Sequence, residues 1–440
     1  MRGRLPLLLL VLGVLFLASL TPIAYAKRLP GPVILVDLVH TDNYGGLCLL
    51  FRIMPEAYWY VLMPKGATLP PEIQKCVNKY AYKILYGSFA DNERYLRDVD
   101  MIIIGQPTKM ISDADAKVIA KWFNEKGKSR ALWCAGDSDY PAQGGKLEIA
   151  DRACDKVLSA MGVKLRLDFV SVEDTASNAG APYRVVALVK PDNRYNASMI
   201  AFGADKVLMH GPGAVAWVDS SGRWHKLTDP NTPKNLIKIL VTTKNGRIVE
   251  HQPKAPGQPG QFGKAHHAGE TGQFVLMAAE VVSANPKEWK VVIASGETPY
   301  GGYQPMISYR YHGVPLDGPR FVRNVLLWAL GYGAEVKGVM EMIKKTPAAA
   351  PASVQKEVEA LKKTVSELQG KVSGTDAALK EVANAVNKLS SVVQEVAKAA
   401  SAAESTASSI STIAYASLGV AIVALIAALV AIAAALMRRK

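Results

Sequence analysis

Apolar runs alternate with amphipathic stretches between residue 31 and about residue 335. Two segments, 114–126 and 321–330, have the apolar spacing of helices, and Ser112 stands where the first of them needs a cap. Strand-like apolar runs occur around them, at residues 33–38, 58–63, 101–105, 130–135 and 291–294. Because continuous apolar strands separated by helices are typical of a parallel sheet covered on both faces, the pattern predicts an α/β head with a flavodoxin-like parallel sheet.

The middle of this head, residues 165–272, has a different pattern. Short strand-like pieces follow one another there, at residues 183–189, 206–210, 215–218 and 236–243. A loop at residues 252–263 comes next and is rich in proline and glycine. We therefore expect a β-rich insertion over the crevice of the sheet, with this loop as a flap.

A heptad pattern occupies residues 353–412. Apolar or small residues recur there with alternating spacings of four and three, and only Thr375 interrupts them. About eight heptads predict a left-handed, parallel coiled-coil stalk, a dimer or a trimer, about 85 Å long. Residues 341–352 contain two prolines and are the expected hinge between head and stalk. The alternative is a single amphipathic helix that lies on the head.

Both ends of the chain are apolar. Residues 1–26 combine two arginines, an apolar stretch and a small-residue site, which predicts a secretory signal peptide; the alternative is an uncleaved anchor. Residues 413–437 contain no charged residue and precede the basic residues 438–440, which predicts one transmembrane helix with a cytoplasmic tail. We therefore expect a single-pass protein of the cell membrane with an extracellular head over residues 27–340.

The formal net charge of the chain is +14 at pH 7. The sequence has no basic run and no basic motif interleaved with aromatic residues, so we do not expect nucleic acid as a partner. Acidic glycans, anionic lipids or an acidic surface lattice suit the charge of an exported protein better. The alternative is that solvated lysines are scattered over the surface without a common partner.

Four cysteines lie in the first half of the head, none with the close spacing of metal ligands: Cys48, Cys76, Cys134 and Cys154. An even number of cysteines in an exported chain permits two disulfides, and the pairing remains open among three arrangements. Asn196 begins an Asn-Ala-Ser glycosylation sequence, which is consistent with a surface loop in an exported protein.

Polar side chains follow several of the predicted strands at the point where each strand ends. Parallel sheets bind ligands at the carboxyl ends of their strands, so these residues are the expected ligand crevice. The set is Asp37, His40, Asn43, Gln106, Asp137 and Glu297. For His40 and Asn43 the alternative is a structural role as capping and turn residues beneath the following helix.

Three potential metal ligands lie close together directly after the flap. On a helix, Glu270 would lie four residues from His266 and three from His267. Gly269 and Gly272 argue against a stable helix there, and no further ligand follows from the sequence. We therefore expect a polar loop near the crevice and neither a metal site nor a cofactor.

The order of these motifs carries a family resemblance. Asp37, His40 and Asn43 form D-x-x-H-x-x-N, a strand ends in Gly-Asp at Asp137, a late strand ends in Ser-Gly-Glu at Glu297, and the closing helix reads N-x-x-x-W-A-L. Over residues 31–333 the chain resembles the class I glutamine amidotransferase-like superfamily. More narrowly, it resembles the non-catalytic branch found in gliding, transport-linked and intraflagellar-transport proteins, which implies a flavodoxin-like fold without catalysis.

The amidotransferases of this superfamily carry a nucleophilic cysteine on a G-x-C-x-G elbow, and Cys134 is the residue that this comparison suggests. Leu132 stands where the first glycine belongs, and the bulk of Trp133 opposes a strained elbow. No H-x-E pair follows in the expected place. We therefore expect Cys134 to be buried or disulfide-bonded, and we expect no enzyme.

Three functions remain as hypotheses. The first is a structural or scaffolding protein of the cell surface that displays the head on its stalk, with its own copies, the lipid bilayer and a surface-layer or envelope protein as partners. Its stalk and anchor resemble the proteins that tether surface layers in archaea. The second is a transport-linked receptor that binds a solute or a glycan in the strand-end crevice. The third is an exported hydrolase, for which the sequence supplies no assembled catalytic set.

Overall fold

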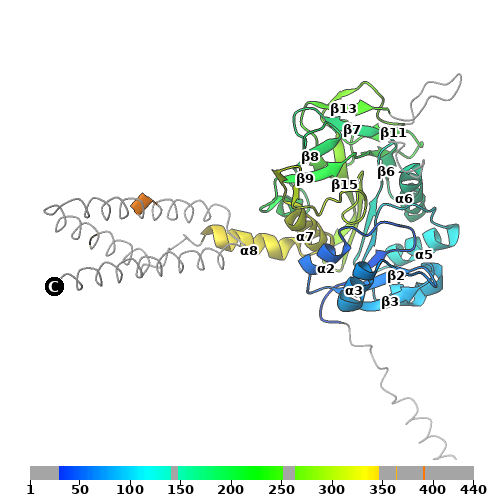
Figure 1. Ribbon diagram of the computed structural model, residues 1–440. Helices are drawn as coiled ribbons and strands as arrows, with labels where there is room; N and C mark the ends of the chain where they lie inside the picture. The colour runs from blue at the N-terminus through cyan, green and yellow to red at the C-terminus, as the bar shows by residue number, and fades with distance from the viewer. Residues whose placement is uncertain (1–28, 140–146, 251–262, 346–362, 364–389, 392–440) are drawn as a thin grey trace, which may run out of the picture. The chain divides into compact units, whose positions relative to one another are not determined.

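The computed structural model describes residues 29–139, 147–250, 263–345, 363, 390 and 391. It places the chain in two compact units, Met1–Ala334 and Glu335–Lys440. Almost all that is described belongs to the first unit, which holds the sheet and the candidate site (Figure 1).

A ten-stranded sheet in the order β3-β2-β1-β4-β5-β16-β15-β12-β8-β9 forms the centre of this unit. Its first six strands run parallel: β3 (Ala81–Tyr86), β2 (Tyr58–Met63), β1 (Val33–Asp37), β4 (Met101–Ile104), β5 (Arg130–Ala135) and β16 (Glu288–Ser295). The next four alternate in direction: β15 (Val275–Asn285), β12 (Leu236–Val241), β8 (Arg184–Val189) and β9 (Lys206–His210).

The mixed sheet corrects the prediction of a flavodoxin-like parallel sheet with a separate β-rich insertion. Strands β8, β9 and β12 lie within the predicted insertion, yet they extend the main sheet through antiparallel pairing. The physical reason is that a strand buried on both faces reads as a continuous apolar run in either direction. The sequence pattern therefore locates such strands without giving their orientation.

Three small sheets complete the strands of the described residues. They are β11 (Trp224–Lys226), β10 (Ala214–Val218) and β6 (Leu165–Asp168); β14 (Thr271–Gly272), β13 (Gly246–Val249) and β7 (Ser171–Asp174); and the hairpin of β17 (Arg310–Tyr311) and β18 (Val314–Pro315). In the first of these sheets β6 and β10 contact β15 and β16 of the large sheet, and in the second β7 contacts β8 (Figure 1).

Helices cover the large sheet. They are α2 (Leu47–Ile53), α3 (Pro71–Tyr80), α4 (Glu93–Leu96), α5 (Asp113–Asn124), α6 (Leu147–Met161) and α7 (Gly318–Ala329), with the 3₁₀ turns η1 (Ala90–Asn92) and η2 (Ala197–Ala201). A further helix, α8 (Gly333–Lys345), follows α7 in the sequence and belongs almost wholly to the second unit. Helix α5 packs against α6, and α2 packs against α3 and α7. Ser112 caps α5, because its hydroxyl accepts the N–H of Asp115 at 3.0 Å.

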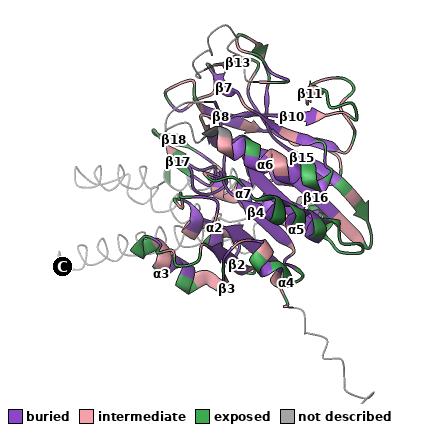
Figure 2. Ribbon diagram, turned by 90° about the vertical axis from the view of Figure 1, so that its right-hand side faces the viewer, coloured by how far each residue is buried: buried purple, intermediate pink, exposed green. Residues whose placement is uncertain are grey.

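The main core lies between the parallel strands and the pair α5 and α6. Leu35, Ile102 and Leu132 of the sheet are fully buried against Ile119 of α5 and Val157 of α6. Figure 2 shows the strands buried and the outer faces of these helices exposed. Continuous burial of the strands is what produces the apolar runs in the sequence, and it fixes where each strand ends and the candidate site begins.

The prediction of a membrane-anchored stalk is corrected. Among the described residues, no helix is long and apolar enough to cross a membrane, and no coiled-coil stalk is present. This finding overturns the expectation of a single-pass protein of the cell membrane with an extracellular head. The predicted signal peptide, nearly all of the stalk at 353–412, and the segments 413–437 and 438–440 lie outside the described residues. An apolar segment or a heptad pattern is compatible with a helix, but neither establishes that the helix forms.

Candidate functional site

The sheet brings the ends of β1, β4, β5 and β16 side by side. These four strands are neighbours and run parallel, so their carboxyl ends lie at one edge. The six residues expected in the ligand crevice follow these strands. The structure divides them into a β1 group, formed by Asp37, His40 and Asn43, and a β5–β16 group, formed by Gln106, Asp137 and Glu297.

The β1 group is a closed hydrogen-bonding network. One carboxylate oxygen of Asp37 lies 2.7 Å from His40 Nδ1, and the other accepts the N–H of Val39 at 2.9 Å. His40 Nε2 lies 4.0 Å from the Asp115 carboxylate. Burial lowers the pKa of His40, but the charge and hydrogen bond of Asp37 outweigh it, so the pKa is raised. The His40 ring is buried and stacks on Phe89. The contacts of this group therefore stabilise a turn.

Asn43 lies in the same turn. Its N–H donates to the Thr41 hydroxyl at 3.3 Å, and its carbonyl oxygen would lie only 2.5 Å from a Cβ atom at Gly301. The loop after β16 therefore packs on the backbone of this turn. The structural alternative for His40 and Asn43 included a cap on the following helix, but Gly46 is the N-cap of α2 and no side chain caps it. The contacts of the two residues described here lie within the turn and with the residues packed on it.

The β5–β16 group contains a pair of buried carboxyl side chains, Asp137 and Glu297. Asp137 accepts the N–H of Ser138 at 2.7 Å, and Glu297 accepts the N–H of Thr298 at 2.8 Å. Glu297 also accepts the N–H of His210. The two residues are 8% and 3% exposed. Burial raises the pKa of Asp137 to about 8. Burial, together with the charge of Asp137, raises the pKa of Glu297 well above its usual range.

These pKa values mean that the carboxyl pair keeps a proton at neutral pH. Two carboxyls that interact in a buried site cannot both ionise cheaply, so the pair retains at least one proton. The pair is then both a donor and an acceptor of hydrogen bonds. Gln106, only 8% exposed, adds an amide that also donates and accepts.

Gly302 closes the site from above. A methyl group at its Cα would lie 3.2 Å from both Gln106 Oε1 and Glu297 Oε1, which places both oxygens against this loop. Gly301 and Gly302 have φ of +79° and +64°, a conformation that favours glycine. The loop between β16 and β17 therefore lies directly over the pair.

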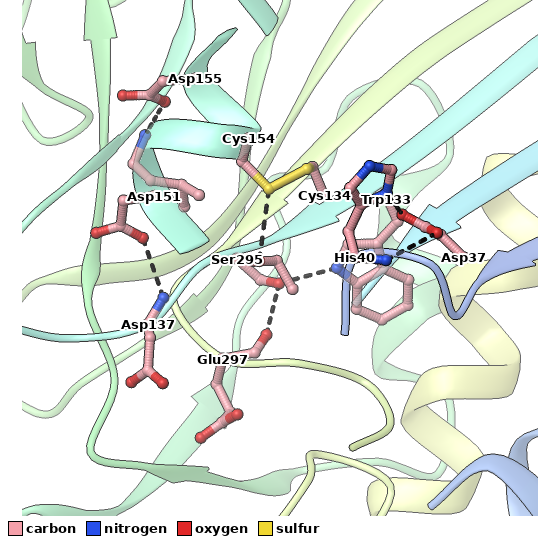
Figure 3. Close-up of a disulfide and its surroundings, with 12 residues drawn as sticks. Asp37, His40, Trp133, Cys134, Asp137, Asp151, Cys154, Asp155, Ser295 and Glu297 are labelled. Carbon is pink, nitrogen blue, oxygen red and sulfur yellow. Dashed lines mark hydrogen bonds and ion pairs between the residues drawn. A yellow bond between two sulfur atoms is a disulfide. The ribbon is translucent and has the colours of Figure 1, made fainter. Parts of the chain in front are cut away.

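A serine fixes the position of Glu297 from below. The hydroxyl of Ser295 donates to the carbonyl of Glu297 at 2.7 Å and accepts the indole N–H of Trp133 at 2.9 Å (Figure 3). Trp133 lies on β5 and is fully buried. No sequence motif indicated this contact, which the parallel register of β5 and β16 produces.

Further buried acids lie behind Asp137, and the sequence reasoning missed them. The carboxylate of Asp151 accepts the N–H of Asp137 at 3.0 Å, and its second oxygen has no hydrogen-bond partner among the described residues. Burial raises the pKa of Asp151 well above its usual value and that of Asp155 to about 7. Both residues lie on α6 with helical spacing, where acids usually indicate a solvated face. Only the packing of α6 against the sheet distinguishes them (Figure 3).

All four cysteines form disulfides. Cys48 is bonded to Cys76, and Cys134 is bonded to Cys154. The first links α2 to α3, and the second links β5 to α6. Cys134 therefore has no free thiol at the end of β5, where the amidotransferases of the resembling superfamily carry their nucleophile.

The three potential metal ligands after the flap do not converge. The ring of His266 lies 2.9 Å from the carboxylate of Asp168, which also accepts the backbone N–H groups of residues 264–266. Burial raises the pKa of Asp168, but the contacts with His266 outweigh it and the pKa is lowered. Glu270 pairs with Lys226 at 2.7 Å, and His267 is exposed. The described part of the chain contains no group of three metal ligands.

Asn196 lies directly before η2. It is half-buried and has φ of +57°, in the left-handed region that asparagine tolerates. The neighbouring Tyr195 is exposed, and its carbonyl accepts the indole N–H of Trp328 at 2.8 Å. The glycosylation sequence therefore lies in a surface turn of the first unit.

Comparisons with known proteins leave the family open. No protein-family model matches the chain, and no curated protein matches it. The chain is similar to the N-terminal domain of mmIFT52 at 10% identity, with a TM-score of 0.37 over 62% of this chain and 97% of that one. It is also similar, at 9% identity, to a Thermoplasma acidophilum protein named for GMP synthase, with a TM-score of 0.25 over 71% of this chain and 98% of that one. Likenesses this weak carry no argument.

Proposed function

We propose that the first unit is a non-catalytic binding domain of the class I glutamine amidotransferase-like type. Its ligand is a small, neutral, polyhydroxylated molecule, which binds at the ends of β4, β5 and β16. The observation that carries this proposal is the buried pair Asp137 and Glu297, which keeps a proton at neutral pH. Buried like-charged groups are costly, and strongly perturbed pKa values at a strand-end edge are typical of functional sites.

The chemistry of the pair favours hydroxyl groups as ligands. Each hydroxyl both donates and accepts a hydrogen bond, and a carboxyl pair that shares a proton offers both partners. The amide of Gln106 offers both as well. An anionic ligand is disfavoured there because the carboxyl pair would repel it. A sugar or a polyol, with several hydroxyls and no charge, is the class that satisfies these groups best.

Access to the pair requires the loop after β16 to move. Gly301 and Gly302 are the natural hinge, because both occupy the region of positive φ in which glycine is unstrained. Gly302 also lies over the oxygens of Gln106 and Glu297. In this proposal the loop closes over the bound ligand and excludes water from it.

The disulfide of Cys134 supports a binding role over hydrolysis. A cysteine in a disulfide cannot attack a substrate as a thiolate. The remaining candidate base, His40, is buried against Asp37 in the β1 group. The disulfide of Cys134 and the burial of His40 therefore support neither amidotransferase chemistry nor an exported hydrolase. The carboxyl pair is the remaining group that can recognise a ligand.

The test is calorimetric titration of the full chain with a panel of neutral sugars and polyols, alongside thermal unfolding. We expect at least one member of the panel to bind and to raise the unfolding temperature, because a ligand at one hundred times its Kd stabilises the folded state by about 2.7 kcal/mol. Glu297→Gln should weaken binding about tenfold, or about 1.4 kcal/mol, because it removes the shared proton.

Asp155→Asn is the matched control. Asp155 is also an acid with a raised pKa, but it accepts the N–H of Leu167 at 2.9 Å and lies away from the strand ends. Its replacement should leave binding unchanged within about twofold. Failure of every neutral sugar and polyol to bind, or equal losses in the two variants, would contradict the proposal.

A further inference from the structure

A second group of polar and aromatic side chains lies on the last two strands of the large sheet, β8 and β9, and on the segment that follows β16. It comprises Tyr183, Arg184, His210, Tyr303 and Tyr311, which we call the Arg184 cluster. Arg184 and His210 are opposite each other in the antiparallel pair β8 and β9, so their side chains share one face of the sheet. None of the five was singled out by the sequence.

The aromatic rings surround the two basic side chains. The guanidinium carbon of Arg184 lies 5.2 Å from the ring centroid of Tyr183 and 5.8 Å from that of Tyr311. The His210 ring lies 4.9 Å from Tyr303 and 5.6 Å from each of the other two tyrosines. An arginine stacked on rings in this way keeps the edge of its guanidinium free to donate hydrogen bonds.

A small core holds the cluster in place. Leu316 is buried with Ala179, Val186 and Leu208, and Tyr311 and Val314 pack against them. The hairpin β17 and β18 turns through His312 and Gly313, both with positive φ, as two-residue hairpin turns require. Tyr311 is therefore presented to Arg184 by a fixed hairpin.

The positive charge of Arg184 is not neutralised by any residue that the structure describes. Its Nε is buried and has no hydrogen-bond partner among those residues. Burial, followed by the charges of Arg184 and His312, lowers the pKa of His210. The charged groups that lower the pKa of His210 are both positive, and a carboxylate is the ligand group that the guanidinium of an arginine matches best.

The tyrosines provide a flat surface beside this charge. Tyr303 is 71% exposed and Tyr183 is 39% exposed, although both rings contact His210. The C–H face of a sugar ring stacks on exposed aromatic rings of this kind. A net charge of +14 adds long-range attraction for an anionic polymer.

We propose that the Arg184 cluster binds a carboxylated sugar, such as a uronic acid unit of an acidic polysaccharide. The carboxylate pairs with Arg184, and the sugar ring stacks on Tyr303. This goes beyond the neutral ligand of the carboxyl pair and does not depend on it. The two surfaces are neighbours, because the N–H of His210 donates to Glu297 while its ring belongs to the cluster.

The experiment is calorimetric titration of the full chain with trigalacturonate, with its neutral trisaccharide counterpart in parallel. Trigalacturonate should bind at least tenfold more tightly than the neutral counterpart, and raising the salt concentration should weaken binding. Arg184→Gln should weaken trigalacturonate binding at least tenfold. Arg184→Lys should recover part of that loss, because it keeps the charge and loses the fork.

Tyr303→Ala and Tyr309→Ala form a matched pair. Both tyrosines are 71% exposed and follow β16, but Tyr309 lies outside the cluster of rings. Tyr303→Ala should weaken trigalacturonate binding several-fold, and Tyr309→Ala should not change it. Asp137→Asn should also leave it unchanged, because Asp137 belongs to the carboxyl pair and not to the Arg184 cluster, which separates this site from the one proposed above. Absence of trigalacturonate binding, competition by inorganic phosphate at equal concentration, or equal losses in the two tyrosine variants would overturn the proposal.

Discussion

Two polar clusters lie at the same edge of the sheet and differ in how their charges are compensated. In the β1 group, the carboxylate of Asp37 is matched by His40 and by backbone N–H groups. In the β5–β16 group, Asp137 and Glu297 are two acids that face the same buried space. The first arrangement stabilises the fold, and the second costs stability. A buried group that works against stability is the better candidate for function, so residue type alone does not identify the site.

The two groups also respond to pH in different windows. The pKa of His40 is raised above 6.5, so its contribution to stability is complete below that pH and is lost as the pH rises through the folded-state pKa. The pKa of Asp137 is raised from 3.8 to about 8, so its contribution is complete below about pH 4 and is lost as the pH rises towards 8. Both contributions fall with rising pH, but that of Asp137 begins to fall at lower pH.

The largest expected change in stability comes from removing the disulfide Cys134–Cys154, which lies behind the β5–β16 group. Cys134 and Cys154 are separated by 20 positions in the sequence, and cross-links over such loops contribute about 3 kcal/mol by restricting the unfolded chain. Replacing both with alanine should lower the free energy of unfolding by about that amount in a denaturant titration. Retention of full stability would show that β5 and α6 do not need this link.

The next effect breaks the β1 group. Asp37→Ala leaves the ring of His40 and the N–H of Val39 without their acceptor, and buried unpaired donors cost about 1–3 kcal/mol. We expect about 2 kcal/mol of destabilisation by chemical unfolding. The pH dependence that begins near 6.5 should disappear, and neutral-sugar binding should survive. Loss of sugar binding in a folded Asp37→Ala variant would place the ligand in the β1 group instead.

A smaller change, an increase in stability, is expected when an acid of the β5–β16 group is replaced by its amide. Asp137→Asn removes an acid that is costly to ionise, so the variant should be more stable than the parent above pH 8 by at least about 1 kcal/mol. Its stability should also fall less between about pH 4 and pH 8. Unfolding curves across this range measure both, and identical pH profiles for the two proteins would contradict a raised pKa.

The smallest effect is expected at Asn43. Its contacts described above use the backbone, and its side chain is half-buried in a turn. Asn43→Ala should therefore change the free energy of unfolding by less than about 0.5 kcal/mol and leave ligand binding intact. If Asn43→Ala weakened ligand binding without lowering the free energy of unfolding, Asn43 would be a ligand-binding residue as first expected.

The sequence located the parallel strands well because they are buried on both faces. Strands β1, β2, β4 and β5 each occupy an apolar run, and their charged positions are Asp37 at the end of β1 and Arg130 at the start of β5. Their order and the polar residues after them also predicted one shared edge. The direction of β15, β12, β8 and β9 was beyond this reasoning, since it depends on pairing between distant segments.

The division of the strand-end residues into two groups was equally inaccessible. This division depends on the side-chain conformations of Asp37 and Glu297. It also depends on the loop after β16, in which Gly302 lies beside the carboxyl oxygen of Glu297. The Arg184 cluster is built from three separate segments that carry no motif. Tyr183 precedes Arg184 in the sequence, and only tertiary contacts bring His210 and Tyr311 beside these two residues.

The most direct test of the central claim is infrared spectroscopy of the carboxyl pair at neutral pH. The account predicts protonated-carboxyl absorption that decreases in the double variant Asp137→Asn with Glu297→Gln and is kept in Asp37→Asn, while Asp151 and Asp155 supply the absorption that remains. An identical spectrum in the parent and the double variant would mean that both acids are ionised at neutral pH. The β5–β16 group would then lack the shared proton on which the proposed ligand chemistry rests.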